Sequence, residues 1–234
     1  RIGLLLFVPS HPVWLLSDRD IDARVDISKK FLQDTGSSSI GFEALQKENS
    51  LTKLKLEKQV SKIHTIRKDL SSEGAEIFFS VHTPYMPIEE FSLASESPRT
   101  RQKTVESVKS CVELAEEIGA QIVNTHLGGV IKITSEGFRN PKIKEATLER
   151  LKEPLADLTS WLDGREVKLS VENVPYPLEE IRLYSPIIGI FPRDFSQIFN
   201  EVNSKNLALT LDFCHLWITH KTMREFVNVP HSRH

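Results

Sequence analysis

The sequence has few features that would place it outside the cell or in a membrane. Its 234 residues include only two cysteines, Cys111 and Cys214, which are too far apart for a C-x-x-C pair or a zinc knuckle. No apolar run approaches the roughly 20 residues that span a bilayer, and residues 2–8 lack the small-residue cleavage site of a signal peptide. We therefore expect a cytoplasmic protein in a reducing compartment, with no membrane association.

A strong charge of one sign is also missing. The 30 lysines and arginines nearly balance the 32 aspartates and glutamates, which leaves a formal net charge of -2. This balance argues against a protein that binds polyanions through bulk electrostatics. With 39% hydrophobic residues, the composition also excludes a disordered or collagen-like chain. A chain of this length can bury a large core.

Short apolar runs alternate along the chain with longer amphipathic stretches. The apolar runs have the length of buried strands and cover residues 3–8, 39–45, 77–81, 121–125, 167–171 and 207–211. The amphipathic stretches have the spacing of helices with one buried face and cover residues 22–34, 52–72, 100–118, 143–162 and 193–203. Because a helical crossover returns the chain to the same end of a sheet, this alternation predicts parallel strands in an α/β fold.

The lengths of the connections favour one α/β architecture over another. The links from strand to helix, at residues 83–98, 127–141 and 173–192, are long, whereas the links from helix to strand are short. This asymmetry is typical of β/α arrays whose site lies at the carboxyl ends of the strands. No G-x-G-x-x-G follows the first strand and no GK[ST] occurs, so we predict a TIM-type (β/α) barrel and not a doubly wound nucleotide-binding sheet.

The number of units is lower than a complete barrel requires. The chain contains about six β/α units, whereas such a barrel has eight and typically about 250 residues. We therefore expect residues 1–234 to form a single TIM-barrel-like domain, incomplete at its C-terminal end. An open barrel leaves unpaired edges at the strands of residues 3–8 and 207–211, and such edges favour association into a homo-oligomer.

A polar residue follows each of four consecutive strands. These residues are His82, His126, Glu172 and Asp212, and His215 follows Asp212 at i+3. In a barrel the carboxyl ends of the strands meet at one mouth, so these side chains should converge. Imidazole and carboxylate donors together suit a divalent cation such as zinc or manganese in preference to magnesium.

Each of these residues also has a plain structural interpretation. A single histidine at a strand end is commonly a satisfied core residue, Glu172 could pair with a lysine, and Asp212 could cap the following helix. The joint pattern is harder to explain in this way. Four polar groups at the ends of buried strands are costly unless they share a partner, and a metal is the simplest one.

Four short segments at these strand ends carry a resemblance to a known family. Residues 81–85, 123–126, 170–173 and 211–215 resemble the xylose-isomerase-like barrel superfamily, which contains sugar and sugar phosphate isomerases and epimerases and the endonuclease IV type of apurinic-site nuclease. The resemblance implies that Glu172 and Asp212 are metal-binding carboxylates common to both branches. It implies that His82, His126 and His215 are further ligands in the nuclease branch, whose site holds three ions.

The two branches are separated by several local features. The sequence His82-Thr83-Pro84-Tyr85 and the presence of His126 resemble the nuclease branch. Residues 126–129 replace the His-Pro-Gly turn of the nuclease branch, which argues against that branch. The acidic strand end at residues 41–43 resembles the sugar branch. No cluster of basic and aromatic residues marks a DNA-penetrating loop. We favour the sugar branch.

The resulting hypothesis is a metal-dependent isomerase or epimerase of a small sugar, sugar phosphate or polyol-derived ketone. Glu172 and His215 are the predicted catalytic residues, and Tyr85, Asn173 and Trp217 are the predicted substrate contacts. The first alternative is an endonuclease IV-like, multi-zinc apurinic-site phosphodiesterase, and only then would DNA be a partner. The second is a metal-binding protein without activity, or an inactive fragment.

Overall fold

The fold is a five-stranded parallel sheet covered by helices. The computed structural model describes residues 18–36, 39–46, 53–72, 74, 76–85, 87–129, 141–175 and 187–218. In these residues the strands are hydrogen bonded in chain order: β1 (Ser39–Leu45), β2 (Glu76–His82), β3 (Ile122–Thr125), β4 (Lys168–Glu172) and β5 (Leu207–Thr210). The helices are α1 (Asp18–Thr35), α2 (Lys53–Ser71), α3 (Pro98–Ile118), α4 (Pro141–Trp161), α5 (Pro192–Val202) and α6 (Phe213–Ile218).

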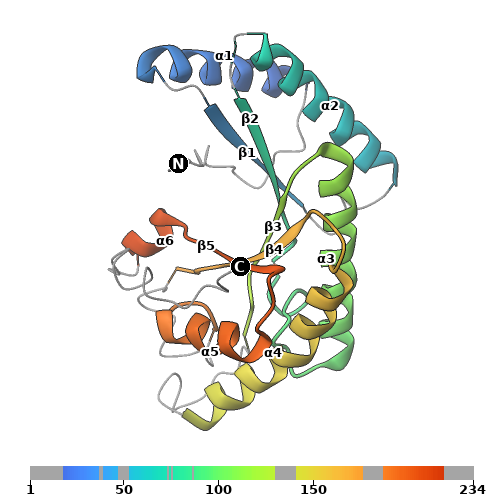
Figure 1. Cartoon of the computed structure of the whole chain (residues 1–234), viewed down its shortest axis with the longest axis vertical. Coiled ribbons are helices and arrows are strands. Elements are labelled where there is room, and N and C mark those ends of the chain that lie inside the picture. Colours follow the sequence, from blue (N-terminus) through green and yellow to red (C-terminus); the bar gives the residue numbers. More distant parts are fainter. Residues whose placement is uncertain are drawn as a thin grey trace.

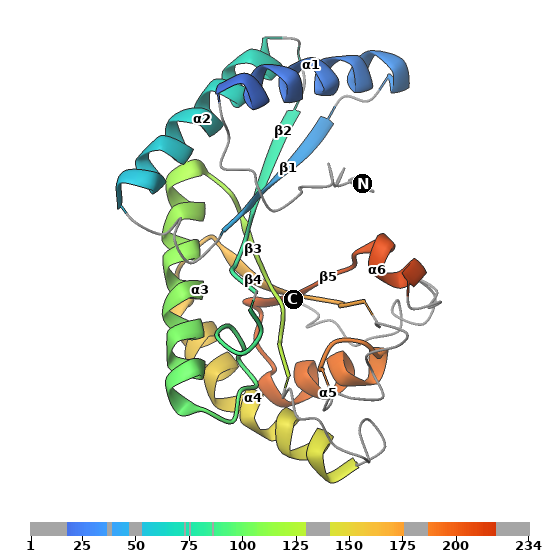
Figure 2. The ribbon, with the colours of Figure 1, turned by 180° about the vertical axis from the view of Figure 1, so that it is seen from behind.

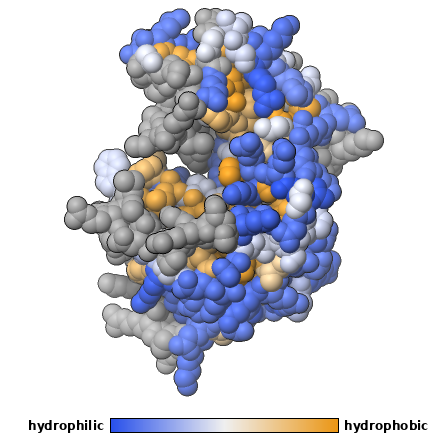
Figure 3. All heavy atoms as spheres, viewed as in Figure 1, coloured by the Kyte–Doolittle hydropathy of each residue, from blue (hydrophilic) through white to orange (hydrophobic). Residues whose placement is uncertain are grey.

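The sheet curves as part of a barrel. Figures 1 and 2 show α1 to α4 arranged around the outside of the curved sheet, with the opposite side of the arc open. Every neighbouring pair of strands is parallel, as the alternation of strands and helices requires. Figure 3 shows hydrophilic residues over α3 and α4, and apolar residues around the gap on the open side. The predicted α/β barrel is therefore confirmed as a partial barrel.

The helix α3 illustrates why these elements form where they do. Ser97 caps its amino end by accepting a hydrogen bond from Thr100 N at 3.3 Å, and Pro98 occupies the first turn. Gly119 ends the helix in the left-handed conformation, with φ of 68°. Between these caps an apolar stripe that includes Val108 and Val112 is fully buried against the sheet.

The chain enters a helix directly beyond β5. The sequence indicated a helix that Asp212 could cap, and the structure has it as the six-residue α6, immediately after Asp212. The physical reason is a side-chain cap, because Asp212 Oδ1 accepts a hydrogen bond from His215 N at 2.8 Å. All five strands predicted between residues 39 and 211 match the structure within one residue at each end, and the strand predicted at residues 3–8 lies outside the described residues.

The two faces of the sheet carry different side chains. The face toward the helices is apolar and includes Phe79, Val81, Val123, Leu169 and Val171, all of them buried. The face toward the barrel interior carries a row of polar side chains that are hydrogen bonded to one another across all five strands: Glu43, Ser80, Asn124, Ser170 and Thr210. The row lies just below the carboxyl ends of the strands, so it supports whatever site forms there.

In the described part of the chain, no helix is both long enough and apolar enough to cross a membrane.

Candidate metal centre

The five predicted donors lie together at the carboxyl end of the sheet. His82 and Glu172 are the last residues of β2 and β4, and His126 follows β3 directly. Asp212 lies just beyond β5, and His215 is in the first turn of α6. The donors form two groups, each with its ligand atoms within 4.8 Å of one another.

The first group consists of His82, His126 and Glu172. Glu172 is 1% exposed, and its Oε2 atom lies 3.2 Å from His82 Nε2 and 4.0 Å from His126 Nε2. Within the described residues this oxygen is buried and has no hydrogen-bond partner of good geometry. A buried carboxylate oxygen without a donor is costly, and two imidazole nitrogens beside it are the partners that a metal ion would share.

The hydrogen bond of the other His82 nitrogen determines which ring nitrogen faces Glu172 with a lone pair. His82 Nδ1 lies 2.7 Å from the carbonyl oxygen of Thr83, which can only accept a hydrogen bond. Nδ1 therefore carries the hydrogen, and in the neutral ring Nε2 presents a lone pair to Glu172 Oε2. Two lone pairs 3.2 Å apart repel unless a proton or a cation lies between them. The residues thus fit a divalent metal.

The second group consists of Glu172, Asp212 and His215, so that the Glu172 carboxylate belongs to both groups. His215 Nδ1 lies 3.4 Å from Glu172 Oε1 and 3.8 Å from Asp212 Oδ2. It also lies 2.7 Å from the carbonyl oxygen of Asn173 and carries the hydrogen of that bond, so Nε2 is the ring nitrogen that could bind a metal. Because Asp212 Oδ1 caps α6, it is Oδ2 that faces this group. The i, i+3 spacing places both side chains at the mouth because the helix begins directly after the aspartate.

The electrostatic environment affects the three histidines and their neighbours differently. Burial lowers the pKa of His126 well below 6.5, and the nearby His82 and His215 lower it further, so that His126 is neutral and able to bind a metal. Burial alone would lower the pKa of His82, but Glu172 and Glu43 outweigh it, and the pKa is raised. A proton therefore competes with a metal at His82. Burial also raises the pKa of Glu43, against the effect of His82.

The three predicted substrate contacts lie in different environments. The ring of Tyr85 packs against the donors, with its centroid 4.6 Å from that of His126 and 5.2 Å from that of His82. Burial and the nearby carboxylates raise the pKa of Tyr85, which keeps its phenol neutral. Trp217 is 80% exposed on α6. Asn173 is 1% exposed, and its amide bonds to the main chain of Asp212.

A loop behind Glu172 also supports the site, and none of the predicted site residues belongs to it. Val174 N donates to the carbonyl of Gly189, and Ile188 N donates to the carbonyl of Gly128. Gly189 has a φ of 102°, and a Cβ there would lie 3.2 Å from the carbonyl oxygen of Glu172. Only glycine fits this conformation without strain, so the glycine in the run Ile187–Ile190 was the available signal.

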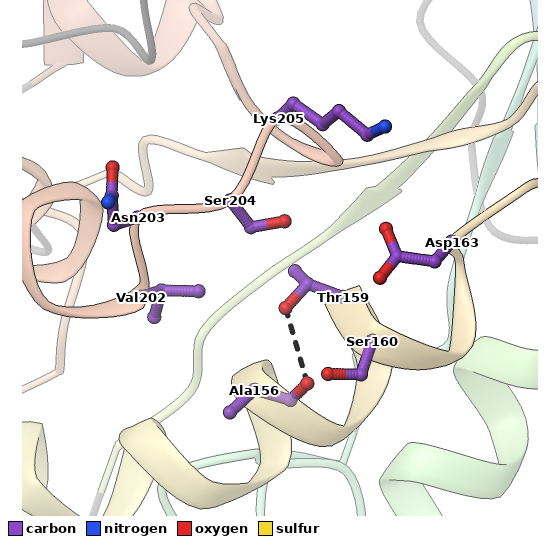
Figure 4. Close-up of a pocket in the computed structure, with 8 residues that line it drawn as sticks. All are labelled: Ala156, Thr159, Ser160, Asp163, Val202, Asn203, Ser204 and Lys205. Carbon is purple, nitrogen blue, oxygen red and sulfur yellow. Dashed lines mark hydrogen bonds between the residues drawn. The ribbon is translucent and has the colours of Figure 1, made fainter.

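A groove of about 460 Å³ lies at the other end of the sheet. Figure 4 shows that Thr159, Asp163 and Lys205 line it, from the end of α4 and the segment before β5. Asp163 Oδ1 accepts a hydrogen bond from Asn206 Nδ2 at 2.8 Å. This end of a β/α barrel usually serves stability, and none of the metal donors lies there.

The chain belongs to the family of xylose isomerase-like TIM barrels, whose sequence profile matches residues 36–234. It is 25% identical over 140 residues to an uncharacterized protein of Methanocaldococcus jannaschii, MJ1311, in a match that covers 60% of this chain and 42% of that protein. The chain thus spans about two fifths of the length of this relative.

Two solved structures show a similar fold. One is an inferred sugar phosphate isomerase/epimerase from Anabaena variabilis, with 21% identity, a TM-score of 0.62, and coverage of 86% of this chain and 60% of that chain. The other is a D-tagatose 3-epimerase-like protein, with 20% identity, a TM-score of 0.57, and coverage of 80% and 61%. At these identities the likeness establishes the fold, and this chain spans about three fifths of each structure.

Proposed function

We propose that the protein is a metal-dependent isomerase or epimerase of a small sugar, sugar phosphate or polyol-derived ketone. The observation that carries the proposal is the buried Glu172 Oε2, which lies beside His82 Nε2 and His126 Nε2 and has no hydrogen bond of good geometry among the described residues. Family membership supports it, as does the fold shared with a D-tagatose 3-epimerase-like protein and an inferred sugar phosphate isomerase/epimerase.

His82, His126, Glu172, Asp212 and His215 are the residues that would hold the metal. The mixture of imidazole and carboxylate donors favours zinc or manganese over magnesium, which prefers oxygen ligands alone. When bound, such a cation polarises a substrate carbonyl and stabilises the negative charge that develops on its oxygen.

Glu172 and His215 are the proposed catalytic residues. A carboxylate at this position can accept the proton from the carbon next to the substrate carbonyl and return it on the same face to the neighbouring carbon, which isomerises the substrate. Epimerisation would in addition need a second acid on the opposite face to return a proton there. The ring of His215 is oriented because its Nδ1 lies 2.7 Å from the carbonyl of Asn173, and it can bind a substrate hydroxyl. Tyr85 forms an aromatic wall beside the histidines and, with Trp217 on the rim, can pack against the sugar.

The test is a solvent-exchange assay on the purified protein. After treatment with EDTA and reloading with manganese or zinc, the protein is incubated in D₂O with a panel of ketoses and ketose phosphates, and proton NMR follows the carbon next to the carbonyl. We expect metal-dependent deuterium incorporation, which Glu172→Gln reduces at least about 100-fold. Metal-loaded protein that exchanges no proton in any substrate would contradict the proposal.

A second candidate function is hydrolysis of the phosphodiester bond at an abasic site. The observation that favours it is the sharing of Glu172 between two donor groups, because two-metal hydrolases hold their ions about 3.5–4 Å apart across such a carboxylate. Its test is an abasic duplex with zinc or manganese present. Strong nicking that EDTA abolishes would place hydrolysis above isomerisation, whereas we expect none at low enzyme concentration.

A further inference from the structure

Asn173 makes an unusually complete set of hydrogen bonds at the candidate metal centre. Its side chain bonds twice to the main chain of one residue: Oδ1 accepts from Asp212 N at 2.6 Å, and Nδ2 donates to the Asp212 carbonyl at 3.0 Å. The residue is 1% exposed. The two bonds use one N–H and one lone pair of the amide, and the burial of the residue closes the rest off from solvent and from a substrate.

The main chain of Asn173 contacts the same segment. Its N–H donates to the carbonyl of Thr210 at 3.3 Å, and its carbonyl accepts from His215 Nδ1 at 2.7 Å. Asn173 also follows Glu172 directly in the chain. One residue therefore fixes the position of three of the five donors: Glu172 through the peptide bond, Asp212 through the amide, and His215 through the carbonyl.

The position of Asn173 in the sheet explains why such a contact is needed. The register of β4 and β5 ends with the pair Glu172 and Thr210. Beyond this pair the chains separate, because Val174 bonds to Gly189 and the chain after Asp212 enters α6. The Asn173 amide supplies the two hydrogen bonds that a continued strand would have exchanged with Asp212.

We infer that Asn173 is a positioning residue that sets the spacing of the Glu172, Asp212 and His215 donors, and that it is not a substrate contact. The inference rests on the proposed function only in that these three side chains bind a cation. It predicts that loss of the amide weakens metal binding before any substrate is present.

The chain offers a matched control. Asn206 is also buried, at 5% exposure, and its Nδ2 also bridges two segments, donating to Thr159 O at 3.0 Å and to Asp163 Oδ1 at 2.8 Å. It lies at the other end of β5, next in the chain to Lys205, which lines the groove in Figure 4. The variants Asn173→Ala and Asn206→Ala remove the same chemical group from equally buried places, and only the first is next to the donors.

The experiment measures cobalt(II) binding, because the visible spectrum of this ion reports the geometry of its ligands. Affinity comes from competition with a chelator, and thermal unfolding in EDTA measures stability without metal. Asn173→Ala should bind cobalt about 10–100-fold more weakly, with a changed visible spectrum, as is usual when a residue that orients metal ligands is lost. Both variants should lower the unfolding temperature in EDTA by similar amounts, because each loses two buried hydrogen bonds. Asn206→Ala should leave the cobalt affinity and spectrum unchanged.

Asn173→Asp serves as the conservative variant if Asn173→Ala does not fold. It keeps the oxygen that accepts from Asp212 N, and its cobalt spectrum should be closer to that of the wild-type protein. A folded Asn173→Ala protein with unchanged cobalt affinity and spectrum but a raised KM would make Asn173 a substrate contact and overturn the inference. Equal weakening by Asn206→Ala would overturn it as well.

The proposed function can fail separately. Wild-type protein that binds cobalt, loses it on Asn173→Ala, and exchanges no proton in any ketose supports the positioning role and contradicts the isomerase. Wild-type protein that binds no cobalt contradicts both.

Discussion

Two equally buried carboxylates in this protein differ in the charge of their neighbours. Glu172 in the candidate metal centre and Asp194 in α5 are each 1% exposed, and each has one oxygen without a hydrogen bond of good geometry among the described residues. Asp194 Oδ1, however, lies 2.5 Å from Lys144 Nζ, so an opposite charge compensates its own. The corresponding neighbours of Glu172 are the ring nitrogens of His82 and His126, at 3.2 and 4.0 Å.

The difference shows how a functional carboxylate can be distinguished from a structural one. A buried charge is retained when a partner compensates it, and for Asp194 that partner is covalently part of the chain. Around Glu172 the chain supplies imidazoles, one of which, His126, has a lowered pKa and is neutral. The compensating charge then comes from a proton on one of the other imidazoles beside Glu172 or from a bound cation, and binding of a cation is the function we propose for the site.

The largest expected effect on stability comes from removing the charge of Asp194. Asp194 lies at the start of α5, and Asp194→Asn leaves Lys144 of α4 without its counter-ion. We expect the free energy of unfolding to fall by about 3 kcal/mol. Urea denaturation in EDTA measures it. Metal affinity of the folded fraction should not change, and a loss of metal binding would mean that the two carboxylates are not separate in function.

The corresponding change at Glu172 should not lower the free energy of unfolding of the metal-free protein. In the metal-free protein above the pKa of His82, Glu172→Gln replaces a buried charge by an amide that can donate to His82 Nε2. We expect the free energy of unfolding to rise by about 1 kcal/mol, or to stay unchanged. A decrease as large as that of Asp194→Asn, in the same urea experiment, would show that Glu172 has a structural role.

The smallest effects concern the pH dependence of the metal-free protein. The pKa of His126 is lowered, so its folded state resists protonation and stability falls as the pH drops below 6.5. The pKa of His82 is raised above 6.5, so its contribution is complete at low pH and is lost as the pH rises through the raised value.

Two variants separate these contributions. His126→Gln should remove the acid-side loss of stability, and His82→Gln should remove the alkaline-side loss. Unfolding free energies in EDTA from about pH 5 to pH 9 measure both. Identical pH profiles for wild type and both variants would contradict the assigned environments.

The sheet and its five donors were predictable from the sequence because they depend on local patterns. Each apolar run has the length of a buried strand and ends next to its polar residue, so His82, His126, Glu172 and Asp212 could be placed at one end of a parallel sheet. For Asp212 the sequence left two interpretations open, a metal donor or a helix cap; the structure shows that Oδ1 caps α6, and Oδ2 faces His215 and stays the predicted donor atom.

The supporting contacts were not predictable because they join residues that are distant in the sequence. Asn124 and Glu43 are 81 residues apart, and Asn173 and Asp212 are 39 apart. Their hydrogen bonds depend on the register of the strands and on where each chain leaves the sheet. Asn173, next to a predicted ligand, was predicted from the sequence to be a substrate contact, and the bonds of its amide to Asp212 support the positioning role that we infer in its place.

The central claim is that Glu172 holds a divalent metal with its histidine neighbours, and a metal-binding titration tests it most directly. Calorimetry with zinc and manganese on EDTA-treated protein, with elemental analysis of the reloaded sample, gives affinity and stoichiometry. The control is His64→Ala, which changes an exposed histidine on α2 that belongs to neither donor group. We predict that the wild-type protein and His64→Ala bind metal equally, and that Glu172→Gln binds it at least roughly 100-fold more weakly. Equal binding by wild type and Glu172→Gln, or no binding by either, would contradict the claim.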